Sequence, residues 1–338
     1  MIETPLAILP LDCGSQEICD WFELYTLSSE YYAVSLHELA RVWDKRKNSE
    51  DADFEGNTVE AQDFLEEIYQ EIRDRMEQLG ECYPFQFSDN DQELIFLNDG
   101  LNDGSNIYIF CLFISHTNNK VIFDKPSFYV INNRVRDLFQ ACATWAAAGL
   151  VEGHSYSFGF PRPDQSGFLE KLTIIYQRFG DGKVMDTPLP GVSKSPKDEE
   201  IDVISWHPRA DSAPGTYYIL GQVASGNNWL DKSIKGAIEA FHGNWLSPIP
   251  ASTPISAMFI PFVVEPVKNE NISDRLGVLT RRLGHIYHRL LIPALARKGL
   301  ELGRNRKHLV IERIDDAVEI SNWIEKVISD FRGECVYS

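Results

Sequence analysis

The chain has 338 residues, of which 43% are hydrophobic and 24% are charged, a globular composition with enough length for two domains. Its longest apolar runs, at 107–114 and 257–264, are far shorter than the roughly 20 residues of a membrane-spanning helix. The first residues lack the basic flank of a signal peptide, so we expect a cytoplasmic protein with no membrane partner.

The acidic excess lies in the first third of the chain. Residues 1–128 contain 26 acidic and 8 basic side chains, whereas the rest contains 24 of each, so the first part accounts for the whole net charge of −18. This asymmetry predicts an acidic N-terminal α/β domain over 1–128, which could bind a partner protein, and a second domain over 129–338. The simpler alternative is an acidic surface that only maintains solubility.

The first domain is predicted to combine helices with short strands. A helix is predicted at 35–43, and strands at 83–88, 93–99 and 106–115. The turn residues of 98–106 indicate a hairpin loop between the last two strands. Regular apolar spacing predicts an amphipathic helix over 58–80. Its expected apolar face comprises Val59, Phe64, Ile68, Ile72 and Met76 or Leu79.

The second domain is predicted to alternate helices and strands, and its stretch 152–167 is rich in Gly and Pro. Helices are predicted at 131–149, 168–180, 229–241, 274–300 and 316–331. Strands are predicted at 201–208, 216–224 and 255–264. This order favours a mixed α/β fold with a mixed central sheet flanked by helices.

Two polar residues lie at matching ends of two predicted strands. Asp202 begins one strand and Gln222 ends the next, so an antiparallel pairing brings them to the same end of the sheet. A carboxylate beside a carboxamide oxygen can hold Mg²⁺ or Mn²⁺ with several waters retained. Glu170 on a packed helix could complete the metal ligands. Lys232 could polarise the attacking water or stabilise charge on a phosphate.

The segments that carry these residues are "FLEKLTIIYQRFG" (168–180), "IDVISW" (201–206), "YYILGQVA" (217–224) and the helix after "NNW". Over about residues 165–265, this order resembles the PD-(D/E)xK nuclease superfamily, which has the restriction-endonuclease-like fold. In that superfamily, a Glu on the first helix, an Asp on one strand and an (E/Q)-x-K motif on the next form the site. By position these match Glu170, Asp202 and Gln222, and the resemblance implies metal-dependent phosphodiester hydrolysis.

The sequence departs from that pattern at Ala224, where the motif has lysine. In the superfamily this lysine can migrate to a neighbouring element, and Lys232 and Lys235 are available on the following helix. Lys232 is the better candidate because "GNNWLDK" forms one compact entry into that helix. The sequence leaves open whether catalysis survives the departure.

The stretch 274–308 carries nine basic and two acidic residues above an apolar helical face. Its basic side chains are available for solvent, for acids of the first domain or for phosphates. The expected phosphate-binding residues, including one from the preceding helix, are Arg281, Arg282, Arg289 and Lys235.

These observations favour a magnesium-dependent endonuclease that cleaves DNA rather than RNA. The resemblance implies an effector of a bacterial restriction or antiphage defence system. One alternative is a catalytically inactive nuclease-like subunit that binds nucleic acid or a partner protein. Another is an interaction protein in which the Asp202–Gln222 pairing has no catalytic role. The sequence leaves homo-oligomerisation open.

Overall fold

The structure, a computed structural model, describes residues 6, 8–47, 59–117, 121–123, 132–193, 196–226, 228–266 and 271–337. Contacts divide the chain into two units, one of Met1–Asn132 with Val318–Ser338 and one of Asn133–Ala317. The expected boundary between 128 and 129 lies outside the described residues, and 318–338 group with the first unit rather than with the second domain. Within the described ranges, no helix has the length and apolar character needed to span a membrane.

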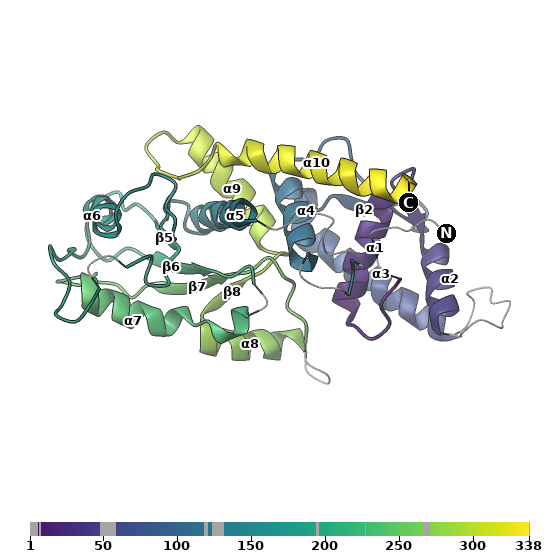
Figure 1. Cartoon of the computed structure of the whole chain (residues 1–338), viewed down its shortest axis with the longest axis horizontal. Helices are drawn as coiled ribbons and strands as arrows, with labels where there is room; N and C mark the ends of the chain where they lie inside the picture. Colours follow the sequence, from purple (N-terminus) through teal and green to yellow (C-terminus); the bar gives the residue numbers. More distant parts are fainter. Residues whose placement is uncertain are drawn as a thin grey trace. The chain divides into compact units, whose positions relative to one another are not determined.

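The first unit contains helices around a small antiparallel sheet of order β1-β3-β2 (Figure 1). Its strands are β1 (Ala33–Ser35), β2 (Phe85–Phe87) and β3 (Glu93–Phe96). Its helices are α1 (Ser15–Ser28), α2 (Leu36–Lys47), α3 (Val59–Leu79), the 3-10 turn η1 (Gly80–Cys82), α4 (Asp103–His116) and most of α10 (Asp316–Tyr337). The strands predicted at 83–88 and 93–99 and the helices predicted at 35–43 and 58–80 are confirmed.

The strand predicted at 106–115 is wrong, because this segment lies in helix α4. Residues 107–116 are buried on every side of the helix, so they lack the polar face that would reveal a 3.6-residue period. A short apolar run of this kind does not distinguish a strand from a buried helix. The turn residues before it cap the helix, since the Asn102 side chain accepts a hydrogen bond from Ser105 N at 3.1 Å.

The predicted buried face of α3 is confirmed at Phe64, Ile68, Ile72 and Leu79, and it differs at two positions. Val59 is 72% exposed, and the fully buried Arg75 occupies a core position one turn beyond Ile72. Arg75 is accommodated there because its guanidinium pairs with the buried carboxylates of Asp20 and Glu23 on α1. The core of this unit therefore contains an ionic cluster as well as apolar side chains.

The second unit is built on a five-stranded mixed sheet of order β4-β5-β6-β7-β8. Pairing is antiparallel between β4 and β5 and between β5 and β6, and parallel from β6 to β7 and from β7 to β8. The strands are β4 (His154–Ser157), β5 (Val203–Trp206), β6 (Tyr218–Val223), β7 (Ile255–Phe259) and β8 (His285–Tyr287). The helices are α5 (Asn133–Val151), α6 (Phe168–Phe179), η2 (Trp229–Asp231), α7 (Ile234–Trp245), α8 (Ile272–Leu283) and α9 (Ile292–Asn305). A mixed α/β fold is thus confirmed.

Helices cover both faces of this sheet, with α5 and α9 on one side and α7 and α8 on the other (Figure 1). Ser155 on β4 donates its hydroxyl to Thr144 O of α5 at 2.7 Å. Helix α9 packs closely on α5 because glycines meet at the crossing, and a Cβ on Gly149 would lie 2.0 Å from Leu295 O. The opposite core contains Phe168 and Trp245 from α6 and α7.

Strand β4 lies in the Gly- and Pro-rich stretch after α5, where no element was predicted. One expectation for the second unit is corrected. The predicted helix over 274–300 is two helices separated by β8, because Gly284 ends α8 at φ 114°. A Cβ at Gly284 would lie 2.9 Å from Ser256 O, so the close approach of β7 also requires glycine.

Candidate functional site

Asp202 and Gln222 lie on adjacent strands at one end of the second sheet. Val203 pairs with Gly221 in the antiparallel register, so Asp202 falls opposite Gln222. Asp202 N donates to Gly221 O at 2.8 Å, and Asp202 Oδ2 accepts from Val223 N at 2.7 Å. Asp202 therefore bonds to the residues on both sides of Gln222, and the structure brings the two together as the hairpin argument expects.

The Gln222 carboxamide has an unused oxygen. The residue is 3% exposed, and its Nε2 is 3.5 Å from Glu200 Oε2. Its Oε1 is buried and has no hydrogen-bond partner among the described residues. Because a buried carbonyl without a donor is unfavourable, this oxygen marks a position where a bound ligand would be stabilising.

Gln140 of α5 joins this group, although the sequence analysis did not select it. A Cβ placed on Gly159 would lie 2.5 Å from Asp202 Oδ1 and 2.6 Å from Gln140 Oε1, so both oxygens border the same small space. The Gln140 Nε2 group donates to Ser157 Oγ at 2.8 Å, which leaves Oε1 available. The bare backbone of Gly159 keeps this space open.

The environment of Asp202 favours its protonated form. Burial raises the pKa of this carboxyl to about 7, while the Val223 N–H hydrogen bond opposes the rise. Asp198 and Glu200 raise the pKa further, and Lys232 lowers it. Asp202 therefore titrates near neutral pH, and a nearby cation would favour its ionised form.

Lys232 approaches Asp202 from the segment between η2 and α7, and its half-buried side chain is near enough to lower the pKa of that carboxyl. The motif position on β6 itself has no room for a lysine. Ala224 is 1% exposed and packs in an apolar cluster with Met258 and Leu279, which Trp229 and Leu230 of η2 also contact. A lysine at 224 would bury its charge in this cluster.

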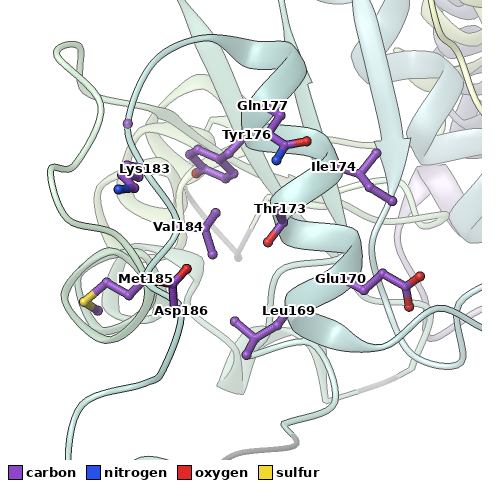
Figure 2. A pocket seen from close by; sticks show the side chains of 11 residues that line it. Leu169, Glu170, Thr173, Ile174, Tyr176, Gln177, Lys183, Val184, Met185 and Asp186 are labelled. Carbon is purple, nitrogen blue, oxygen red and sulfur yellow. The ribbon is translucent and has the colours of Figure 1, made fainter.

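The structure does not bring Glu170 to Asp202. Glu170 is exposed at the start of α6, where its Oε2 accepts from Gly167 N at 3.2 Å. With Leu169 and Val184 it lines a cavity of about 670 Å³ between α6 and residues 182–186. In Figure 2 the Glu170 carboxylate points away from Tyr176 and Lys183, and Asp202 is not among the residues that line this cavity.

Three of the four expected phosphate-binding residues lie together. Lys235 Nζ donates to Arg281 O at 3.0 Å, and Arg282 Nη2 donates to Leu230 O at 3.1 Å, which connects α7 and η2 to α8. Their side chains are exposed beside the Lys232 segment. Arg289, in contrast, is fully buried. It follows β8 rather than continuing a surface helix, so it does not present its guanidinium to a nucleic acid.

Asp202 and Gln222 lie opposite each other in the strand register, and Asp202 Oδ1 and Gln140 Oε1 border the space at Gly159, so this end of the sheet offers one carboxylate and two amides. Such hard oxygen ligands suit Mg²⁺ or Mn²⁺ with several waters retained, and the orphaned Gln222 Oε1 fits this role. Across the described residues, no group of three or more His, Cys, Asp and Glu side chains could hold a metal ion. The chain matches no family model, and neither the curated proteins nor the solved structures contain a significant match to it.

Proposed function

We propose that the second unit is a restriction-endonuclease-like core that hydrolyses phosphodiester bonds in nucleic acid, DNA in preference to RNA, with a divalent metal ion. The observation that carries this proposal is the position of Asp202 at a sheet end, opposite Gln222 in the strand register and with its Oδ1 on the same space as Gln140 Oε1. The order α5-β4-α6-β5-β6-η2-α7-β7, in which three antiparallel strands are followed by a parallel one, supports it.

Each residue has a distinct role in this proposal. Asp202, Gln222 and Gln140 would hold Mg²⁺ or Mn²⁺, which when bound acts as a Lewis acid and lowers the pKa of a bound water. Lys232 favours ionised Asp202 and stabilises negative charge on the reacting phosphate. The exposed cations Lys235, Arg281 and Arg282 contact neighbouring phosphates. Gln140, rather than Glu170, provides the helical position of the site.

The biological setting we propose is an effector of a bacterial restriction or antiphage system. The acidic residues of 1–128 repel DNA at long range, which favours a partner protein that binds this region and delivers the substrate. One observation favours the alternative of an inactive nuclease-like subunit. The two other proposed ligands, Gln222 and Gln140, are uncharged amides, and the lysine position of β6 is the buried Ala224.

Lys232→Met tests the proposed role of the cation beside Asp202. Loss of one preorganised charge at a reacting phosphate typically lowers the rate by about 10²–10³-fold, so we expect cleavage of single-stranded and plasmid DNA in Mg²⁺ or Mn²⁺ to fall by that factor. Lys298→Met is the matched control, since Lys298 forms an exposed pair with Glu152 at 2.5 Å. Wild-type rates in Lys232→Met would exclude the role, and an inert wild-type protein would favour the inactive subunit.

Gly159→Ala should impair cleavage without unfolding the protein. The new methyl group would lie 2.5 Å from Asp202 Oδ1 and 2.6 Å from Gln140 Oε1, and both are tips of side chains that can move aside. A displacement of about 1 Å at such a site can lower a rate ~10²-fold. Gly167→Ala is the control because its nearest neighbour would lie at 3.9 Å. Thermal melting and plasmid cleavage are measured together. Cleavage by Gly159→Ala at the wild-type rate would contradict the expectation.

A further inference from the structure

Phe160 presents an exposed aromatic ring beside the candidate site. It is 54% exposed, and it is the one phenylalanine that is exposed among the described residues. It directly follows Gly159, whose backbone N–H donates to Asp202 O at 3.1 Å and whose Cβ position adjoins Asp202 Oδ1. The ring is therefore carried by the segment that borders the proposed metal ligands.

The backbone around Phe160 is held by hydrogen bonds and by the buried Arg162. Phe160 N donates to Asp198 Oδ2 at 3.2 Å. The Arg162 side chain is 5% exposed, and its guanidinium lies 5.0 Å from the Phe158 ring centroid. The same guanidinium donates to Lys197 O, which connects the turn to the segment that precedes β5. The exposure of Phe160 is thus a defined feature of a packed turn.

An exposed cation accompanies the ring. Lys197 Nζ lies 5.8 Å from the centroid of the Phe160 ring, and its side chain is open to solvent. Aromatic rings stack on nucleobases without regard to sequence, and neighbouring cations bind the phosphates of the same strand. In a duplex, both faces of each base are covered by the adjacent bases, so such a ring stacks on an unpaired base.

We propose that Phe160 and Lys197 form a stacking site for an unpaired nucleobase, so that the nucleic acid bound beside Asp202 is single-stranded. This inference rests on the proposed function, because it names the substrate form for the same site. Phe160 would fix the strand by stacking, and Lys197 would bind an adjacent phosphate.

The test compares binding of a fluorescent single-stranded oligonucleotide and its duplex by anisotropy in EDTA, where no cleavage occurs. Stacking on one aromatic ring changes affinity by roughly 5–100-fold, so we expect Phe160→Ala to weaken single-strand binding by that factor and to leave duplex binding within about twofold. Phe160→Trp should retain single-strand affinity. Lys197→Met should weaken it and reduce its salt dependence. Tyr217→Ala is the control, because Tyr217 is a 49% exposed aromatic residue next to the opposite end of β6.

Unchanged single-strand affinity in folded Phe160→Ala, or an equal loss for both oligonucleotides, would overturn the stacking site. The tests of the stacking site and of the nuclease activity can fail independently of each other. If wild-type protein cleaves and the loss of Asp202 abolishes cleavage, unchanged single-strand affinity in Phe160→Ala refutes the stacking site alone. If single-strand binding depends on Phe160 but no cleavage is seen with either metal, the stacking site stands and the nuclease proposal fails.

Discussion

Asp202→Asn should make the protein more stable at pH 8 while it abolishes metal-dependent cleavage. Asparagine keeps a side-chain oxygen for the Val223 N–H bond but carries no charge, so it removes the unfavourable burial of a carboxylate. It also removes the single carboxylate of the proposed donor set. A gain in stability together with a loss of activity is typical of a functional side chain held in an unfavourable environment.

The sign and the pH window follow from the pKa of Asp202. Its native pKa of about 7 exceeds the ordinary value of 3.8, so the native state binds the proton more tightly than the unfolded chain. Stability from this group is therefore fully present below about pH 4 and is lost as the pH rises to about 7. With about 1.4 kcal/mol per pKa unit, we expect a gain on the order of 2–4 kcal/mol for Asp202→Asn at pH 8 and little change near pH 4.

Thermal and denaturant unfolding in EDTA at the two pH values measure this gain. Asp211→Asn is the matched control, because Asp211 is an exposed carboxylate whose pKa is held low by the hydrogen bond and charge of Arg209. That variant should not be stabilised at pH 8. Equal stability of Asp202→Asn and wild type at pH 8 would contradict the burial argument, and persistent cleavage of single-stranded or plasmid DNA would exclude Asp202 from the site.

The site residues on the strands, Asp202 and Gln222, were predictable from sequence, whereas the site residue on a helix, Gln140, was not. The apolar pattern of 201–224, two strand-like runs joined by one polar loop, predicts the β5–β6 pairing, and this pairing places Asp202 opposite Gln222. Which helix reaches that sheet end depends on tertiary packing. The acidic residue Glu170 on α6 was the predicted helical ligand. Helix α5 instead brings Gln140 there, and an amide among small helical residues gives no sequence signal.

The same limit explains the errors in the fold. Long amphipathic elements such as α3 were predicted because one face of each contacts solvent. Helix α4 was not, since its buried apolar run shows no period. The position of Arg75 was missed for a related reason. A charged residue at core spacing is normally assigned to the surface, and its partners Asp20 and Glu23 lie more than 50 positions earlier in the chain.

Arg75→Met should cause the largest loss of stability in the first unit. Arg75 Nη1 lies 2.7 Å from both Asp20 Oδ1 and Glu23 Oε1, and all three side chains are buried. Tyr83 and Tyr108 donate to Glu23, and His116 Nε2 lies 2.6 Å from Asp20 Oδ2. Methionine fills a similar volume but leaves two buried carboxylates without their guanidinium, a change that typically costs about 3–5 kcal/mol.

Calorimetry of the full chain should show this loss as a lower unfolding temperature. Lys47→Met is the control because Lys47 forms an exposed pair with Glu60 at 2.5 Å, and such pairs contribute about 0–1 kcal/mol. Arg75→Lys should fall between wild type and Arg75→Met, because an ammonium keeps the charge but lacks the planar fork that also donates to Gln16 O and Glu71. If Arg75→Met and Lys47→Met lost equal stability, the buried cluster would not be the main ionic determinant of this unit. A larger loss in Arg75→Met than in Arg75→Lys would attribute the effect to uncompensated charge rather than to lost packing.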